Sequence, residues 1–305
     1  IAPDPRGYGL TTGWDADYHG DVASFRFVNL LRDILGLLLA MDIEHIEILV
    51  GHDFGSAAAA YAALIRPDMF RRVVLMSAPF SGPPPIRQQG PTVDINASLA
   101  ALDRPRKHYH QYYSTPEANA DMHNCPQGVH DFMRAYYHHK SADWKHNQPH
   151  TLQAWNADDL ARLPTYYVMD LDKNMAETVA PEIPSPAAIA NCTWLPEGEL
   201  RVYSETYQQT GFQGGLNWYR CRFVDAFTRE LQIFSGRTID VPAMFISGKS
   251  DWGTYQVPGA LEEMQSAVCS DYRGTHLIDG AGHWVQQEKP EAVNQLLINF
   301  ATTKS

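Results

Sequence analysis

The chain has 305 residues, of which 44% are hydrophobic and 19% are charged, and its formal net charge is −11. This composition excludes a disordered chain, because enough apolar surface is present to build a core. The acidic balance argues against a nucleic-acid-binding protein, since phosphate binding needs a basic surface. The longest apolar stretch, Ile34 to Met41, is too short for a membrane span, which needs about 20 residues.

The cysteines indicate neither a zinc cage nor a disulfide framework, because they lie far apart and form no Cys-x-x-Cys pair. The four are Cys125, Cys192, Cys221 and Cys269. We therefore expect a reducing compartment and a cytoplasmic location.

The first third of the chain alternates helix and strand. Apolar residues at helical spacing predict a helix over residues 22–41. The β-branched run Ile46–Val50 predicts a short buried strand, and the alanine-rich segment 56–65 predicts a helix that stops before Pro67. A second strand is expected over residues 73–76.

The last third repeats this alternation. Strands are predicted at residues 243–247 and 275–278, and helices at 260–268 and 291–301. Such alternation at both ends favours a parallel sheet covered by helices.

The middle of the chain differs, because Pro-rich segments alternate there with aromatic, helix-like stretches that show no clean strand pattern. We interpret it as an inserted helical lid. The expected organisation is a first core segment at residues 1–82, a lid at 83–237 and a second core segment at 238–305.

The sequence Gly51-His52-Asp53-Phe54-Gly55 stands between the predicted strand and helix. A strand that enters Gly-x-nucleophile-x-Gly and leaves as a helix is a nucleophile elbow, whose glycines on either side keep neighbouring atoms from colliding. The usual alternative for two nearby glycines is an ordinary turn. With the strand before it and the helix after it, the pattern favours an elbow with Asp53 at its apex.

An aspartate at this apex has a chemical consequence. Attack of a serine on a saturated carbon would leave an ether, whereas attack of a carboxylate leaves an ester that water can hydrolyse. A carboxylate is also ionised at neutral pH, since its unperturbed pKa is about 4. Asp53 therefore predicts displacement at a saturated carbon, which means opening an epoxide or expelling a halide.

The elbow requires an acid and then a histidine further along the chain. Asp251 follows the strand at 243–247, and His283 follows the strand at 275–278. Both lie at the carboxyl ends of predicted parallel strands, where such sheets carry their chemistry. His283 is expected to deprotonate water, and Asp251 to hold its tautomer. The alternatives are a solvated loop aspartate and a histidine stacked on Trp284.

The lid is rich in histidines, which raises the question of a metal site. No His-Glu-x-x-His pattern and no pairing with cysteine occurs, so we expect surface or packing roles and no bound metal. The residues concerned are His108, His110, His123, His130, His138, His139, His146 and His150.

With these residues placed, the chain resembles the soluble epoxide hydrolases of the α/β-hydrolase superfamily over nearly its whole length. The matching segments are Ala2–Gly9, Gly51–Gly55, Gly211–Arg220, and Gly282–Gln286 with Lys289-Pro290. The first two are shared with haloalkane dehalogenases, and the third is the most specific.

The resemblance implies roles for further residues. Tyr219 occupies the place of one of two lid tyrosines that hydrogen-bond the epoxide oxygen, and its partner aligns on Tyr109, or on Tyr112 or Tyr113 if the register slips. The usual alternative for such tyrosines is aromatic core. The backbone N–H of Phe54 is expected in the oxyanion hole. The expected substrate pocket includes Trp218, Trp252 and Trp284.

Two further comparisons bear on this interpretation. Haloalkane dehalogenases typically carry tryptophan where this chain has Phe54, so Phe54 together with Tyr219 favours epoxide over halide. The family also begins with further strands and a His-Gly-x-Pro loop that supplies a second oxyanion-hole N–H, and neither is found here. We therefore expect the N-terminal strands to be absent from an incomplete sequence, the strand at 46–50 to be an exposed edge, and the 305 residues to be unstable or inactive alone.

The sequence thus predicts an α/β-hydrolase fold with a helical lid, and hydrolysis of an epoxide to a vicinal diol through a covalent Asp53 ester. No cofactor, metal, nucleic acid or membrane span is expected. The alternatives are a haloalkane dehalogenase and a non-catalytic ligand-binding member of the fold. The oligomeric state is left open, with a homodimer among the options.

Overall fold

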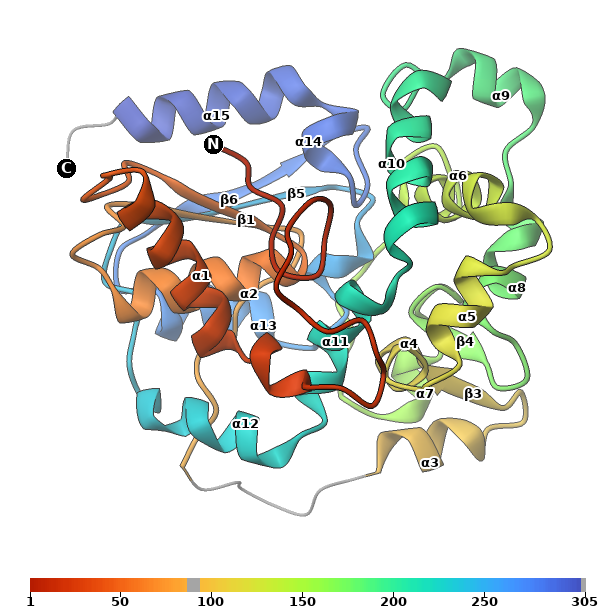
Figure 1. The fold of residues 1–305 in the computed structure, drawn as a ribbon, viewed down its shortest axis with the longest axis horizontal. Helices are drawn as coiled ribbons and strands as arrows, with labels where there is room; N and C mark the ends of the chain where they lie inside the picture. Colours follow the sequence, from red (N-terminus) through yellow and green to blue (C-terminus); the bar gives the residue numbers. More distant parts are fainter. Residues whose placement is uncertain (87–93, 303–305) are drawn as a thin grey trace. The chain divides into compact units, whose positions relative to one another are not determined.

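The computed structural model describes residues 1–86 and 94–302 (Figure 1). Contacts divide the described residues into two compact units. We call the first the helical unit; it draws on Ile1–Arg26, Gln89–Trp144 and Ala154–Thr228. We call the second the sheet unit; it draws on Phe27–Gln88, Lys145–Gln153 and Arg229–Ser305.

The sheet unit contains a four-stranded parallel sheet in the order β1-β2-β5-β6. Its strands are β1 (Leu49–His52), β2 (Val73–Met76), β5 (Ala243–Gly248) and β6 (Tyr272–Ile278). β2 and β5 are buried along their whole length, as expected of central strands made of apolar residues. β1 lies at an edge of the described sheet, and its Val50 is 39% exposed.

Helices cover both faces of this sheet. They are α1 (Phe27–Ala40), α2 (Phe54–Ile65), α13 (Ala260–Glu263), α14 (Val285–Glu288) and α15 (Pro290–Thr302). The unit also contains the short turns η3 (Gln232–Phe234), η4 (Trp252–Thr254) and the π-helical turn η5 (Met264–Val268). α1 packs on α2 through Leu31 and Leu38.

The alternation of side chains along each strand separates two cores. Val73, Leu75 and Phe245 pack against the apolar residues of α2 and α13. Val74 and Ile246, one residue along, point the other way and pack against α14 and α15. The arrangement of α15 on one side of the strands and of α2 and α13 on the other can be followed in Figure 1. The predicted α/β-hydrolase architecture of a mostly parallel sheet flanked by helices is confirmed.

The helical unit consists mainly of short helices. Its elements are η1 (Val22–Phe25), α3 (Ile95–Ala100), β3 (Arg106–His108), α4 (Tyr109–Tyr113), α5 (Ala118–His123), α6 (Gly128–Lys140), α7 (Ala157–Leu160), β4 (Val168–Asp170), α8 (Met175–Val179), η2 (Ala180–Glu182), α9 (Pro186–Asn191), α10 (Glu197–Thr210) and α11 (Gln213–Arg222). The helix α12 (Asp225–Leu231) follows. None of the helices in residues 1–86 and 94–302 combines the length and the apolar character that a membrane crossing requires.

The middle of the chain, which showed no clean strand pattern, contains a pair of strands beside its helices. β3 and β4 pair antiparallel, with Lys107 opposite Met169. The buried Arg106 supports the pair by donating to the carbonyl of Val168. Each strand has three residues, too few to show an alternating pattern.

Other elements differ from the sequence expectation at their ends. β1 begins at Leu49, because Ile46 makes only an isolated bridge to Phe70. The helix expected over 260–268 is α-helical only to Glu263 and continues as the π turn. The helix expected over 22–41 is interrupted at Arg26, where ψ is 147°.

Candidate active site

Asp53 lies at the junction of β1 and α2, in a backbone conformation that is unusual for a residue other than glycine. Its φ is 53° and its ψ is −118°, a strain of about 1–3 kcal/mol. The backbone is held there because the N–H of Asp53 donates to the carbonyl of Met76 on β2, at 3.0 Å. The geometry is that of an elbow, with the Asp53 side chain 27% exposed.

The two glycines of the elbow are not equivalent. A Cβ on Gly51 would lie 2.1 Å from the carbonyl oxygen of Gly55, so only glycine fits where β1 passes the start of α2. A Cβ on Gly55 would meet no atom within 4 Å outside its own helical turn. The prediction that both glycines prevent collisions therefore holds for Gly51 and was wrong for Gly55.

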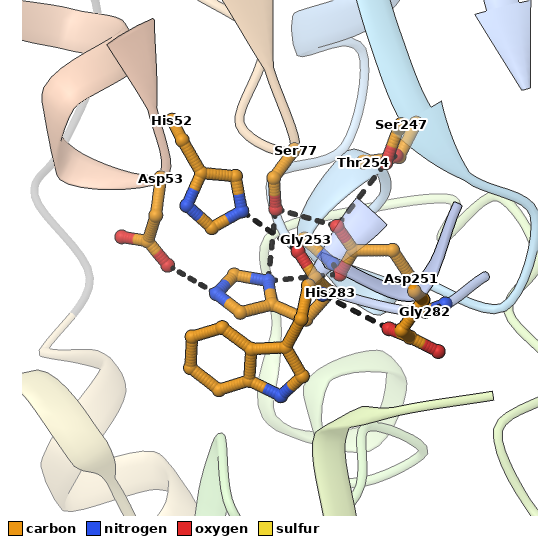
Figure 2. Close-up of polar contacts among 11 residues, drawn as sticks. His52, Asp53, Ser77, Ser247, Asp251, Gly253, Thr254, Gly282 and His283 are labelled. Atoms are coloured by element: carbon orange, nitrogen blue, oxygen red, sulfur yellow. Dashed lines mark hydrogen bonds and ion pairs between the residues drawn. The ribbon is translucent and has the colours of Figure 1, made fainter. Parts of the chain in front are cut away.

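His283 stands between two carboxylates, as Figure 2 shows. Its Nε2 is 2.8 Å from Oδ2 of Asp53, and its Nδ1 is 3.2 Å from Oδ1 of Asp251. The three residues come from three different loops, after β1, β5 and β6. The structure thus brings together the nucleophile, acid and base candidates that the sequence indicated.

Asp251 is 2% exposed, yet its carboxylate is surrounded by donors. Gly253 N donates to Oδ1 at 2.7 Å, and Ser77 and Ser247 donate to Oδ2 at 2.5 and 3.1 Å. Burial alone would raise the pKa of Asp251, but the charge of His283 and the hydrogen bonds from His283, Ser77 and Gly253 outweigh it and hold the pKa below the usual value. Asp251 is therefore an ionised partner for His283.

The hydrogen bonds determine which nitrogen of His283 carries a proton. An ionised carboxylate only accepts, so the proton between Nδ1 and Asp251 belongs to Nδ1. Nε2 lies 2.8 Å from the Asp53 carboxylate, and an ionised Asp53 would likewise accept a proton from Nε2. With a proton on each nitrogen, His283 is an imidazolium that donates to both carboxylates.

The loop that carries His283 is clamped from two sides. The Glu288 carboxylate accepts from Gly282 N at 3.0 Å and from Trp284 N at 3.1 Å, one residue on each side of His283. His52, next to Asp53, is 2.7 Å through its Nε2 from the carbonyl oxygen of His283. Burial lowers the pKa of His52 to about 4, with the His283 charge acting in the same direction, so His52 is a neutral donor.

The predicted lid tyrosines lie in the helical unit. Tyr109 is the first residue of α4 and Tyr219 lies on α11, with ring centroids 5.7 Å apart. Tyr113 contacts the Tyr219 ring at 5.0 Å and donates its hydroxyl to Tyr136 at 3.3 Å. Tyr112 donates to Asp121 at 3.0 Å. The assignment of Tyr109 as the partner of Tyr219 stays a prediction.

The remaining predicted residues have the following surroundings. Phe54 begins α2, so its backbone N–H belongs to the first helical turn, and its ring stacks on Phe27. Trp284 packs edge-on against His283, at 4.7 Å. Trp252 is 4% exposed and packs on His150. Trp218 donates its indole N–H to the carbonyl of Arg6 within the helical unit. Roles for these residues in binding substrate stay predictions.

Histidines of the middle segment make ordinary hydrogen bonds and ring contacts. His130 lies 3.0 Å from both Ser204 and Glu197, and His139 packs between Trp144 and Tyr166. Over residues 1–86 and 94–302, no group of three or more His, Cys, Asp or Glu side chains is arranged to hold a metal ion.

Ser77 and His52 are among the residues of the site that were not singled out from the sequence. Ser77 directly follows β2, and a polar residue at the carboxyl end of a buried parallel strand was a usable signal. His52 lies inside the elbow motif, but a local pattern cannot show that its partner is 231 residues away.

Comparison with known proteins agrees with this geometry. The model of the alpha/beta hydrolase fold family matches residues 1–290. Epoxide hydrolase B of Mycobacterium tuberculosis is 28% identical over 312 residues, which cover 98% of this chain and 82% of that protein. An epoxide hydrolase structure from an endophytic Streptomyces has a TM-score of 0.76 and 26% identity, with 97% of this chain and 78% of that chain covered. Epoxide hydrolase A from Mycobacterium thermoresistibile has a TM-score of 0.69 and 30% identity, with 98% and 80% covered.

The chain therefore belongs to the alpha/beta hydrolase fold family. Within it the chain groups with the epoxide hydrolase family, and the resemblance found in the sequence motifs is confirmed.

Proposed function

We propose that this protein is an epoxide hydrolase, which converts an epoxide and water to a vicinal diol through a covalent ester on Asp53. The observation that carries the proposal is a carboxylate at the elbow apex, 2.8 Å from a histidine whose other nitrogen faces a second, buried carboxylate. The names of the relatives support the substrate class, since the curated and structural matches above are epoxide hydrolases.

The first step is attack by Asp53 on a ring carbon. The new Asp53 O–C bond forms as the ring C–O bond breaks, and the ring oxygen takes a proton from a tyrosine hydroxyl, for which Tyr219 and Tyr109 are the candidates. Ester formation removes the negative charge of Asp53. The proton on Nε2 of His283 then no longer has the Asp53 carboxylate as its acceptor, and it moves through solvent to the tyrosinate.

The second step is hydrolysis of the ester. Neutral His283 takes a proton from water at Nε2, and the hydroxide attacks the ester carbonyl. The N–H of Phe54, in the first turn of α2, stabilises the oxyanion. Collapse breaks the bond between the ester carbonyl carbon and the substrate oxygen. The leaving alkoxide takes the proton of the new carboxyl group to give the diol, and Asp53 is left ionised beside the imidazolium of His283.

Displacement of halide from a haloalkane is the alternative reaction that must be distinguished from epoxide hydrolysis. It would use the same nucleophile, but Phe54 offers no side-chain N–H to a leaving halide. We expect the protein to form diol from styrene oxide and to release no halide from 1-chlorohexane, with Asp53→Ala inactive on both. Halide release faster than diol formation would reject the proposal.

A further inference from the structure

Ser77 occupies a strained position at the carboxyl end of β2. Its φ is 69°, and the residue is fully buried. Its N–H donates to the carbonyl of Ile246 on β5 at 3.0 Å, which holds the strained turn in place. A positive φ favours glycine, so the turn itself does not require the Ser77 side chain.

The Ser77 hydroxyl lies between the acid and the base of the site (Figure 2). Its Oγ is 2.5 Å from Oδ2 of Asp251 and 2.9 Å from Nδ1 of His283. The ionised carboxylate can only accept, so the hydroxyl proton points to Asp251. A lone pair of Oγ then faces Nδ1, whose N–H is shared between Oγ of Ser77 and Oδ1 of Asp251.

We propose that Ser77 is a positioning residue, which bridges Asp251 and His283. The bridge keeps a proton on Nδ1, so that Nε2 is the nitrogen that takes a proton from water. This inference deepens the proposed function and rests on it. The bridge matters most in ester hydrolysis, where His283 is the base. It matters less in ring opening, where Asp53 itself attacks.

Three variants separate this role from a structural one. Ser77→Ala and Ser77→Gly both remove the hydroxyl, and Ser77→Gly also suits the positive φ, so it should melt at or above the temperature of Ser77→Ala. Ser247→Ala is the matched control. The buried Ser247 hydroxyl donates to the same Asp251 oxygen at 3.1 Å, but its other partner is Thr254.

The kinetic test is a single turnover of styrene oxide with excess enzyme. The reaction is stopped with acid at a series of times, and the amount of covalent ester is measured by mass spectrometry. In both Ser77 variants we expect ester formation within about 3-fold of wild type and ester hydrolysis slowed roughly 10- to 100-fold, as for loss of a hydrogen bond to a charged group. Ser247→Ala also removes a donor to Asp251 but no contact with His283, so it should slow hydrolysis less than either Ser77 variant does. The bridge would be overturned if Ser77→Gly hydrolysed the ester at the wild-type rate, or if ester formation and ester hydrolysis slowed equally. It would also be overturned if Ser247→Ala hydrolysed the ester as slowly as the Ser77 variants.

A measurement without substrate keeps the inference independent of the enzymatic activity. In ¹⁵N-histidine-labelled protein, the Nδ1 proton of His283 should exchange slowly with water in wild type and Ser247→Ala. It should exchange roughly 10-fold faster in the two Ser77 variants. Unchanged exchange would reject the bridge. If exchange were faster in the Ser77 variants but the wild-type protein formed no ester, the proposed function would be rejected and the hydrogen bond between Ser77 and His283 would still be supported.

Discussion

Single residues of this protein show two opposing effects on a charged side chain: burial disfavours the charged form, and hydrogen bonds to it favour that form. Asp251 remains ionised in the interior because the charge of His283 and several donors offset the cost of burial. His108 shows the opposite outcome. Burial, with the nearby charge of Arg222, lowers its pKa to about 4, and its Nδ1 accepts from the N–H of His110 at the start of α4.

This lowered pKa predicts a pH dependence of stability. The folded pKa of His108 lies below the ordinary 6.5, so the unfolded chain binds the extra proton, and stability is full above about pH 6.5 and lost as the pH falls towards 4. Between about pH 7 and pH 5 the loss from this residue is about 2 kcal/mol.

The matching substitution is His108→Asn, because asparagine keeps an N-cap acceptor but does not titrate. Urea unfolding at the two pH values should show a loss of stability about 2 kcal/mol smaller in this variant than in wild type. His45→Asn, at an exposed histidine, is the control and should behave as wild type. Equal losses in all three proteins would show that His108 is not held neutral in the folded state.

At the scale of residues, the sequence predicted Asp53, Asp251 and His283 because each sits in a short motif directly after a strand. It did not predict Ser77, whose contacts with Asp251 and His283 span 174 and 206 residues. A serine after a strand is common, and only the folded chain shows what its hydroxyl meets.

At the scale of elements, the elbow depends on one close approach between β1 and α2. Gly51→Ala would place its Cβ 2.1 Å from a backbone oxygen that no rotamer change can move. We expect it to destabilise the protein by more than about 3 kcal/mol, or to prevent folding. Gly55→Ala has open space and a helical backbone, so it should be neutral or stabilising by up to about 1 kcal/mol. Thermal unfolding of the pair tests this; a Gly55→Ala variant as damaged as Gly51→Ala would contradict it.

The strands and helices of the sheet unit were predictable because their signal is local. β2 has the bounds expected from its apolar run, and α15 extends the expected helix by one residue at each end. β3 and β4 were not predictable, since they are stabilised by each other across 60 residues of chain and by the buried Arg106. Each has only three residues, which is too short to show the alternation that marks a strand.

At the scale of the whole molecule, the proposed reaction needs acids in addition to the nucleophile Asp53. Tyr219→Phe and Tyr109→Phe should each slow ester formation by roughly 10- to 1000-fold, because each removes a donor to the developing alkoxide. The double variant should be nearly inactive. Tyr112→Phe is the control, because the Tyr112 hydroxyl donates to Asp121. Full activity of Tyr109→Phe together with a defect in Tyr112→Phe would move the assignment to Tyr112.

The central claim is that Asp53 attacks the epoxide itself, and isotope transfer tests it most directly. In a single turnover with excess enzyme in ¹⁸O-labelled water, the diol should be largely unlabelled, because its new oxygen comes from the Asp53 carboxylate. The peptide that contains Asp53 should acquire the label. If water activated by His283 attacked the epoxide directly, the diol would carry the label from the first turnover and Asp53 would stay unlabelled, which would contradict the account.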